Sequence, residues 1–518
     1  MATRTLPAIR RVGVVLGYLL VYVMIWAGLA MLIAAIGIRN YFGKISFGQM
    51  RLNIVTLETD GGGGSLVWMG ILGIGVLPLV ITVGIAVWQY FRRRKRRRLG
   101  CDTRPHSKKW AMRGISTAVV ATVAAGGTTA FASTVGIGDY IRSASSPYNM
   151  GDYYAEPTVT SADAKRNLVT IYLESGEQTL ANDEHFEKDA FAPLKDVTRP
   201  EDGWQSIENF NQYEGGGWTM SGLVSTQCGV PLKGVGASVD SGSPDQLVGS
   251  MNNYLGGLTC LGDILAEQGY NNVFLGGANP SFAAKGTFLA SHGYTKDLGL
   301  DDWRAAGEPE ESFRSDWGLS DQRLMANAKN EIDQLHAQTE KTGQPFNLSM
   351  LTLDTHEPVH VYDYCPVDTQ DALTSVYSCS MTQVTGFVEY MEEKGYLDDT
   401  AVVIMGDHLK HMSVSDAFHE QLDDNNNRTI FNRIWIPGGD KNRTLRPGVD
   451  QLNMYSTILE AAGLTLKDRE AGLGVSAFAP EIPPDSAQAM EPDTYAALLY
   501  SLSPKFYAEA WANEDAAP

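Results

Sequence analysis

The chain has 518 residues and a formal net charge of −19, but the charge is divided unevenly along it. Residues 1–142 carry 18 basic and 4 acidic side chains, whereas residues 143–518 carry 23 basic and 56 acidic ones. Such an acidic part excludes nucleic acid as its partner, and we interpret its charge as a solvated surface. The length leaves room for a membrane anchor and one large domain or two ordinary ones.

Three uncharged stretches near the amino terminus are long enough to cross ~30 Å of hydrocarbon as helices. They run from Val12 to Ile38, Ser65 to Phe91 and Gly114 to Gly138, and the third is rich in Ala, Gly and Thr. A loop with eleven Lys and Arg separates the second from the third, and the positive-inside rule places it in the cytoplasm. A nucleic-acid patch is the alternative for these charges, but their position between two apolar stretches favours topology.

Four cysteines follow the predicted spans, and a fifth, Cys101, lies in the basic loop. Oxidising surroundings outside the membrane favour disulfides. Four cysteines allow three pairings, and proximity in sequence favours Cys228 with Cys260 and Cys365 with Cys379. A metal site is the alternative, but none of the spacings resembles the short cysteine pairs of structural zinc sites.

Apolar runs alternate with helix-period segments after a polar linker at residues 142–166. The predicted strands are the run NLVTIYL from Asn167, then Asn272–Gly276, Phe346–Leu353, Thr400–Met405 and Ile434–Ile436. The predicted helices are Leu261–Gln268, Asp321–Thr339, Met381–Lys394 and Leu452–Ala462. This alternation predicts an α/β domain over residues 167–479, with a mainly parallel sheet covered by helices on both faces. We assign residues 1–141 to the anchor and 480–518 to an acidic appendage with one short helix, Tyr495–Leu502.

Polar side chains follow three of these strands, where the chemistry of parallel sheets collects. Glu174 and Ser175 follow the first, and Asp354, Thr355 and His356 follow the third. The fourth is followed by Gly406, Asp407 and His408. Carboxylates and imidazoles without thiolates suit a divalent ion such as Mn²⁺, Mg²⁺ or Zn²⁺.

A glycine-rich turn places Thr219 at the start of an apparent helix, in the segment GGGWTMSGLVSTQCGVPL. A helix N-terminus favours phosphate, and a bound metal would activate a threonine hydroxyl as a nucleophile. An ordinary helix cap is the alternative role for this residue.

Several segments together resemble a known family. In order and spacing they are similar to the phosphoglycerol transferases of osmoregulated periplasmic glucans, which are related to lipoteichoic acid synthases within the alkaline-phosphatase/sulfatase superfamily. The segments are NLVTIYLES, GGGWTMSGLVSTQCGVPL, CLGDILAEQGY, FLGGANPSFAAKGTFLASHGY, DWGLSD, LDTHEP and GDHL. The resemblance runs from about Asn167 to about Leu473 and includes the four exported cysteines. The basic loop, the third apolar stretch and the tail from about Pro480 lie outside it.

The resemblance implies a set of site residues. One metal ion, Mn²⁺ first with Mg²⁺ or Zn²⁺ as alternatives, would be held by Glu174, Thr219, Asp407 and His408. His356 would lie near the transferred phosphate, with a structural histidine as the alternative. Substrate contacts would come from Lys285, Asn279 and Trp317, although the spacing around Lys285 differs from the Trp-x-Arg of the synthases and Trp317 has a buried structural role as its alternative.

The resemblance also implies an activity at the outer face of a bacterial cytoplasmic membrane. Phosphoglycerol would pass from phosphatidylglycerol, through a covalent intermediate on Thr219, to a periplasmic glucan or a membrane lipoglycan such as lipomannan. A phosphoethanolamine transferase, a lipoteichoic-acid-type synthase and an inactive membrane-tethered binding protein are the alternatives. A sulfatase activity is disfavoured, because CGVPL has its proline one position late and no arginine.

The three predicted crossings lead to a direct test. A reporter fused after residue 150 should show the activity of an exported protein, because an odd number of crossings places this junction opposite the basic loop. Alkaline phosphatase and green fluorescent protein fusions at the same junction measure the two outcomes. A fluorescent, phosphatase-negative junction would overturn the topology.

Overall fold

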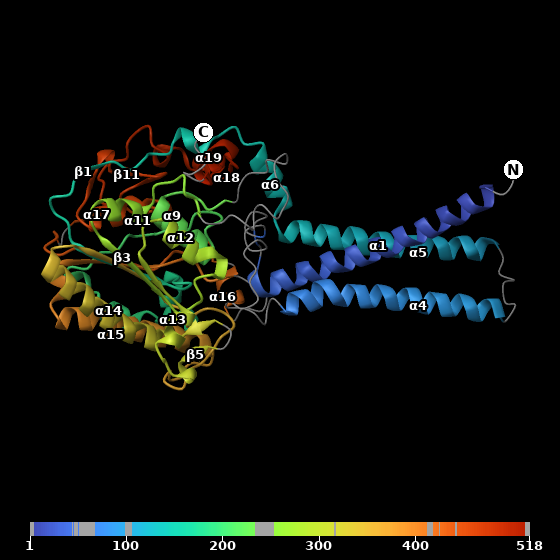
Figure 1. Ribbon diagram of the computed structural model, residues 1–518, viewed down its shortest axis with the longest axis horizontal. Helices are drawn as coiled ribbons and strands as arrows, with labels where there is room; N and C mark the ends of the chain where they lie inside the picture. Colours follow the sequence, from blue (N-terminus) through green and yellow to red (C-terminus); the bar gives the residue numbers. More distant parts are fainter. Residues whose placement is uncertain are drawn as a thin grey trace. The chain divides into compact units, whose positions relative to one another are not determined.

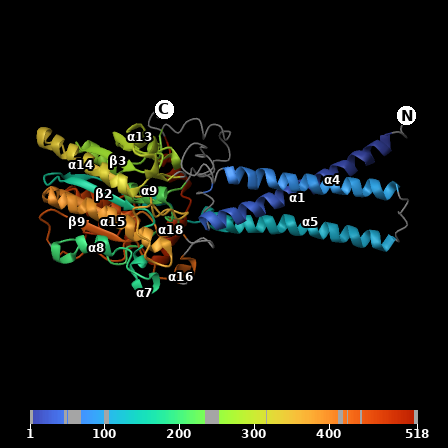
Figure 2. The same ribbon diagram turned by 90° about the horizontal axis from the view of Figure 1, so that it is seen from below.

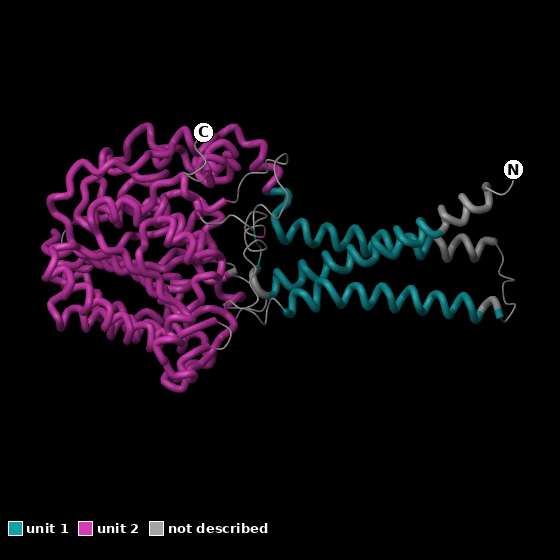
Figure 3. The backbone as a smooth tube through the Cα atoms, viewed as in Figure 1, with its two compact units in different colours: residues 1–47, 64–139, 413–415 teal, residues 48–63, 140–412, 416–518 magenta. Residues whose placement is uncertain are grey.

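The computed structural model describes residues 5–43, 45, 50, 68–98, 106–233, 253–314, 317–411, 418–423, 425–440 and 443–512. It contains two compact units (Figure 3). One comprises residues 1–47, 64–139 and 413–415, and the other comprises residues 48–63, 140–412 and 416–518. Cys101 lies outside the described residues.

The first unit contains three long helices. They are α1 (Thr5–Phe42), α4 (Leu77–Arg98), which a π-helical turn at Ile71–Val76 precedes, and α5 (His106–Thr134). The segments Val15–Asn40, Trp68–Lys95 and Gly114–Thr134 are long and apolar enough to cross a membrane. Each overlaps one of the three predicted spans, and the start of the second span, residues 65–67, is outside the described residues.

Close packing of α1 and α5 explains the small residues of the third span. A Cβ atom at Gly127 would lie 2.0 Å from the carbonyl oxygen of Gly28, so the two backbones touch at this crossing. Interfaces between membrane helices use small residues in this way. Near the same end of both helices, Arg39 Nε donates to the Thr134 hydroxyl at 2.9 Å.

The second unit is built on a six-stranded sheet, visible in Figure 1. Its strand order is β4-β3-β7-β2-β8-β9, parallel throughout except that β9 runs antiparallel to β8. The strands are β2 (Asn167–Leu173), β3 (Asn271–Gly276), β4 (Lys296–Leu298), β7 (Phe346–Leu351), β8 (Thr400–Gly406) and β9 (Asn432–Trp435). The predicted α/β fold with a mainly parallel sheet is therefore confirmed.

Helices cover both faces of this sheet (Figures 1 and 2). Along β2, Leu168 and Tyr172 enter one hydrophobic cluster, whereas Val169 and Ile171 enter the other. Both sets are fully buried, which explains why the strand is apolar at successive positions. One face carries α9 (Thr219–Cys228), α11 (Leu261–Glu267), α12 (Lys285–Ser291) and α17 (Met454–Ala461), and the other carries α8 (Ala192–Val197), α14 (Asp321–Thr342) and α15 (Ala372–Glu393).

Smaller elements complete the second unit. Three two-stranded ribbons pair β1 (Val159–Ser161) with β10 (Thr465–Leu466), β5 (Phe313–Arg314) with β6 (Gly318–Leu319), and β11 (Glu470–Ala471) with β12 (Gly474–Val475). Short helices are α6 (Ile137–Ala144), α7 (Asp183–Phe186), α13 (Leu300–Ala305), α16 (His419–Asp423), α18 (Pro492–Tyr500) and α19 (Pro504–Ala510). The strand β1 falls within the predicted linker, so part of that segment pairs with the domain.

The first and last segments of this unit touch one another. The backbone N–H of Leu502 donates to the Ser143 carbonyl at 3.3 Å, and the N–H of Met150 donates to the Ser503 hydroxyl at 2.9 Å. Tyr507, fully buried, donates its hydroxyl to the carbonyl of Pro231, three residues beyond the end of α9. The tail thus contains two helices where the sequence predicts one, and α19 supports the segment that leaves α9.

We expect Tyr507→Phe to lower the thermal unfolding midpoint of the second unit by roughly 2–6 °C, because the buried Pro231 carbonyl loses its donor. Tryptophan fluorescence of the detergent-solubilised chain measures the midpoint. Tyr500→Phe is the matched control, since Tyr500 is 38% exposed on α18. Equal midpoints for the two variants would show that the tail rests on the domain without supporting it.

Candidate active site

Two carboxylates and an imidazole meet where strands β2 and β8 end. Glu174 follows β2, and Asp407 and His408 follow β8. All three side chains are buried, and one potential ligand atom from each lies within 4.8 Å of the others. The Nε2 atom of His408 is 3.5 Å from a Glu174 oxygen and 3.6 Å from an Asp407 oxygen. The structure therefore brings together three of the residues that the sequence places at strand ends.

Glycines allow these elements to approach so closely. A Cβ atom at Gly406 would lie 2.1 Å from the carbonyl oxygen of Gly176, so only glycine fits where β2 and β8 end. A Cβ atom at Gly222 would lie 2.2 Å from the carbonyl oxygen of Asp407. Because Gly222 belongs to α9, this second contact seats the helix directly against the carboxylate cluster.

Thr219 is the first residue of α9, and its hydroxyl donates to a Glu174 oxygen at 3.2 Å. Trp218, not Thr219, occupies the N-cap position, so the threonine side chain faces the carboxylates and does not cap the helix. The first bond of the helix joins the N–H of Gly222 to the carbonyl of Trp218. The N–H groups of Thr219 and the next two residues precede that bond, as in helix N-termini that bind phosphate.

The far end of α9 is covalently fixed. Its last residue, Cys228, forms a disulfide with Cys260 at the start of α11, and Cys365 is bonded to Cys379 in α15. Both predicted pairs are thus bonded in the structure. The helix that carries Thr219 is held at one end by a disulfide and at the other by the close contact at Gly222.

Hydrogen bonds fix the orientation of the cluster. The Nδ1 atom of His408 lies 2.7 Å from the Leu409 carbonyl, which assigns the proton to Nδ1 and directs Nε2 as an acceptor toward the carboxylates. The N–H groups of Ser175 and His408 both donate to Asp407 Oδ1 at 2.8 Å. The Ser175 hydroxyl donates to Glu174 at 2.8 Å.

The electrostatics of the cluster favour a cation. Burial and the Glu174 carboxylate raise the pKa of Asp407 to about 7. Burial also acts to raise the pKa of Glu174, but the His356 and His408 imidazoles outweigh it and lower that pKa to about 2. Asp407 Oδ2 is buried and has no hydrogen-bond partner among the described residues. Two carboxylates, one of which holds this oxygen, and an acceptor nitrogen fit a divalent ion.

His356 and Trp317 lie together in the loops beside the cluster. Their ring centroids are 4.1 Å apart, and the Nδ1 atom of His356 lies 2.6 Å from the Glu357 carbonyl, so Nε2 is left outside this bond. Burial lowers the pKa of His356, which the Glu174 carboxylate partly offsets. Trp317 is buried, and its Nε1 has no partner among the described residues. This indole N–H therefore suits a substrate oxygen.

The two other predicted substrate residues differ in their surroundings. Lys285 is buried, and burial lowers its pKa to about 8. The Asp297 and Glu174 carboxylates partly offset this effect, so the negative charge of the cluster acts on the Lys285 amine. Asn279 donates to Asp301 at 3.1 Å and accepts from the Ser281 N–H at 2.9 Å. Its amide thus organises the loop after β3.

Sequence reasoning missed His411, whose ring centroid lies 5.1 Å from that of His408. Burial and the neighbouring His408 ring lower the pKa of His411 well below its usual range. The signal was present in GDHLKH, where a second histidine follows the first by three positions. Thr352 was also missed; its hydroxyl accepts from the backbone N–H of Glu174. Thr355, which the sequence places at the same strand end, donates its hydroxyl to the Glu174 carbonyl.

Asp354, which the sequence places with the site carboxylates, pairs instead with Asp321 at the start of α14. The N–H of Asp321 and the hydroxyl of Tyr364 donate to Asp354, and the Asp354 N–H donates to Asp321. Burial and the adjacent Asp321 carboxylate raise the pKa of Asp354 well above its usual range. This carboxyl pair holds the loop that carries His356.

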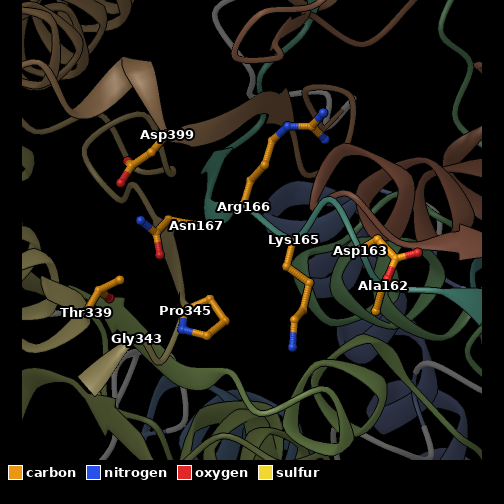
Figure 4. A pocket seen from close by; sticks show the side chains of 9 residues that line it. All are labelled: Ala162, Asp163, Lys165, Arg166, Asn167, Thr339, Gly343, Pro345 and Asp399. Carbon is orange, nitrogen blue, oxygen red and sulfur yellow. The ribbon is translucent and has the colours of Figure 1, made fainter. Parts of the chain in front are cut away.

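A separate pocket of 330 Å³ lies at the opposite edge of the sheet (Figure 4). Asn167 opens β2, while Pro345 and Asp399 precede β7 and β8, so the pocket is at the amino ends of the strands. None of its residues belongs to the carboxylate cluster. In parallel sheets the catalytic groups gather at the carboxyl ends, where the cluster lies.

Comparison with known proteins places this geometry in a family. The sequence model named Sulfatase matches residues 167–464, which contain the sheet and the whole cluster. The chain belongs to the sulfatase family. The match begins at the strand that leads to Glu174 and extends past His408.

Curated relatives have a more specific name. Phosphoglycerol transferase I of Salmonella typhimurium is 32% identical over 347 residues, which are 63% of this chain and 41% of that protein. Phosphoglycerol transferase I of Escherichia coli O139:H28 is 32% identical over 348 residues. The resemblance stated from the motifs is therefore confirmed. The chain matches less than half the length of these relatives.

Solved structures with a similar arrangement are more distant in sequence. A protein in the alkaline phosphatase superfamily from Vibrio parahaemolyticus has a TM-score of 0.47 and 20% identity, over 66% of this chain and 76% of that one. The lipoteichoic acid synthase LtaP from Listeria monocytogenes has a TM-score of 0.46 and 15% identity, over 62% and 79%.

The carboxylate cluster predicts that the chain binds a divalent metal ion. We expect Asp407→Asn to weaken Mn²⁺ binding on the order of a hundredfold, because it removes one charge from the donor set. Isothermal titration of the metal-stripped full chain measures the affinity. Asp399→Asn, at the opposite edge of the sheet, is the matched control. Equal affinities for both variants would place the metal elsewhere.

Proposed function

We propose that the chain transfers phosphoglycerol from phosphatidylglycerol to a glycan of the bacterial cell envelope. The observation that carries the proposal is the Thr219 hydroxyl, at the first turn of α9 and 3.2 Å from Glu174. The similarity to proteins named phosphoglycerol transferase I supports the choice of the transferred group. The acceptor we propose is a periplasmic glucan or a membrane lipoglycan such as lipomannan.

The proposed reaction has two displacements. The Thr219 oxygen attacks the phosphorus and forms an O–P bond, while the bond from phosphorus to the diacylglycerol oxygen breaks. Glu174 accepts the threonine proton, and His356, as an imidazolium whose Nδ1–H is bonded to the Glu357 carbonyl, gives its Nε2 proton to the departing oxygen, so that diacylglycerol leaves as a neutral alcohol. An acceptor hydroxyl then gives its proton to the Nε2 atom of His356 and attacks the phosphorus, the bond to Thr219 breaks, and Glu174 returns its proton to the threonine oxygen.

Glu174, Thr219, Asp407 and His408 are the residues we propose to hold one divalent ion, with Mn²⁺ as the first choice and Mg²⁺ or Zn²⁺ as alternatives. When bound, such an ion would lower the pKa of the threonine hydroxyl and offset the charge of the phosphate. The N–H groups at the start of α9 face the same place and favour a phosphate there.

Other activities fit the geometry less well. Cys228 is disulfide-bonded, so it is not available for conversion to the formylglycine of a sulfatase. A phosphoethanolamine transferase or a lipoteichoic-acid-type synthase would use the same nucleophile with another head group or acceptor. An inactive binding protein would have no need of an Asp407 oxygen that lacks a hydrogen-bond partner among the described residues and lies beside a helix N-terminus.

The proposed setting is the outer face of a bacterial cytoplasmic membrane. Residues 1–141 would anchor the chain, residues 142–166 would lead out of the membrane, and residues 167–479 would carry catalysis. A lipid donor makes such an anchor useful, because the substrate is confined to the bilayer. Glycans of a strain lacking this protein, compared by mass spectrometry with the parent strain, would identify the acceptor by their lost glycerophosphate esters.

Thr219→Ala should lower diacylglycerol release from phosphatidylglycerol on the order of a thousandfold or more, because it removes the attacking oxygen. Thr219→Ser is the matched control, since it keeps a hydroxyl at the same position and should retain part of the rate. Acid-quenched wild type should carry a phosphoglycerol adduct on the peptide that contains Thr219.

The same assay separates the alternatives. Release from phosphatidylethanolamine but not from phosphatidylglycerol would identify the other head group. A folded Thr219→Ala protein that works at nearly the wild-type rate would eliminate the covalent mechanism.

A further inference from the structure

Exposed apolar side chains of the second unit gather beside the site. Among its described residues, the large apolar side chains that are exposed are Ile141, Phe282, Val359, Val361, Val367 and Tyr500. Phe282 belongs to the loop after β3, and the three valines belong to the loop after β7, which also carries His356. Scattered apolar residues are normal on a protein surface. Here four of the six exposed apolar side chains lie in the two loops after β3 and β7, so they are concentrated in one part of the unit.

These two loops are joined through Trp317. The Phe282 ring meets the Trp317 ring edge-on, with centroids 5.5 Å apart, and the opposite partner of Trp317 is His356 at 4.1 Å. Phe282 is 42% exposed whereas Trp317 is 4% exposed, so the aromatic chain leads from solvent to the imidazole. Val359 and Val361, 36% and 40% exposed, follow His356 by three and five positions. We call Phe282, Val359 and Val361 the apolar rim.

Hydrogen bonds and a disulfide hold the segment that carries the exposed valines. Arg314 donates to the carbonyls of His356 and Pro358, which precede Val359 in the chain. Farther along, Tyr364 donates to Asp354 and Cys365 is bonded to Cys379. The valines are therefore presented to solvent by a structured loop, and their exposure does not result from a lack of contacts around them.

The composition of the rim favours hydrocarbon as its ligand. The two valine side chains of the rim cannot hydrogen-bond to sugar hydroxyls and offer no flat face for a sugar ring, so this part of the rim is poorly suited to a glycan. A strip of exposed aliphatic groups beside a phosphate-transfer site suits a molecule that is charged at one end and apolar at the other.

We propose that the apolar rim binds the diacylglycerol part of the lipid donor while its phosphodiester lies at Thr219. This inference rests on the proposed function and adds a binding site for the leaving group. Two rim residues follow His356 in the same loop, and the third contacts Trp317, the ring partner of His356; His356 is the residue assigned to the departing oxygen. The hydrocarbon of the leaving group would thus run along Val359, Val361 and Phe282.

The test compares two donors on the full-length protein. Val359→Thr combined with Val361→Thr keeps side-chain shape but adds hydroxyls to the rim. We expect kcat/KM for dioleoyl phosphatidylglycerol in mixed micelles to fall roughly tenfold. With water-soluble dibutyryl phosphatidylglycerol, kcat/KM should change by less than about twofold, because little hydrocarbon reaches the rim.

Control variants distinguish a role of the rim in lipid binding from a role in the chemical step. Val359→Ile with Val361→Ile should keep the long-chain activity, and Tyr500→Gln on α18 should leave both donors unchanged. An unchanged ratio between donors in the threonine variant would overturn the rim while leaving the proposed function intact. An equal loss with both donors, or a loss confined to glycan transfer after normal diacylglycerol release, would also overturn it. If wild type released diacylglycerol from neither donor, the proposed function itself would fail, and the rim with it.

Discussion

Burying Glu174 and Asp407 within one small volume is the constraint on which the second unit depends. Two carboxylates beside one imidazole repel each other, and their removal from water adds a further cost. Two backbone N–H groups on Asp407 Oδ1 and the His408 ring offset part of that cost. Asp407 Oδ2 is left without a partner among the described residues, so a cation is the natural completion of the arrangement. Such an arrangement is typical of a binding site, because a stable core pairs its buried polar atoms.

Holding these charges together requires rigid surroundings. Glycines at positions 176, 222 and 406 allow two strand ends and a helix to converge, because any Cβ atom there would strike backbone. The adjoining loop relies on the Asp321 and Asp354 pair, whose hydrogen bonds tie the start of α14 to the end of β7. Thr219, on α9, and His356, in the loop after β7, are therefore held beside the cluster by separate sets of contacts.

Much of this could be predicted from local sequence. The strands were identified because buried parallel strands are continuously apolar, and Glu174, Asp407 and His408 stand directly after two of them. Thr219 was found because a glycine-rich turn precedes an apolar helix. Each signal lies within a few residues of the side chain that it identifies.

The remainder depended on contacts between distant segments. The three-residue edge strand β4 is too short for periodicity to show. Helix α15 begins at Ala372, nine residues before the predicted start, because Asp371 caps it by accepting the Leu373 N–H. The ring contact between Trp317 and His356 and the pairing of Asp354 with Asp321 join loops whose proximity no local pattern predicts. Residues near 150–161 are polar enough to suggest a linker, yet Met150 is fully buried and β1 pairs with β10.

The hydrogen bond between Leu502 and Ser143 brings an early and a late segment of the second unit next to each other. A domain whose first and last segments meet can be joined to, or placed within, another polypeptide without rearranging its interior. The second unit is therefore closed on itself by the bonds from Leu502 to Ser143 and from Met150 to Ser503, so that a fusion at either end would leave its core in place.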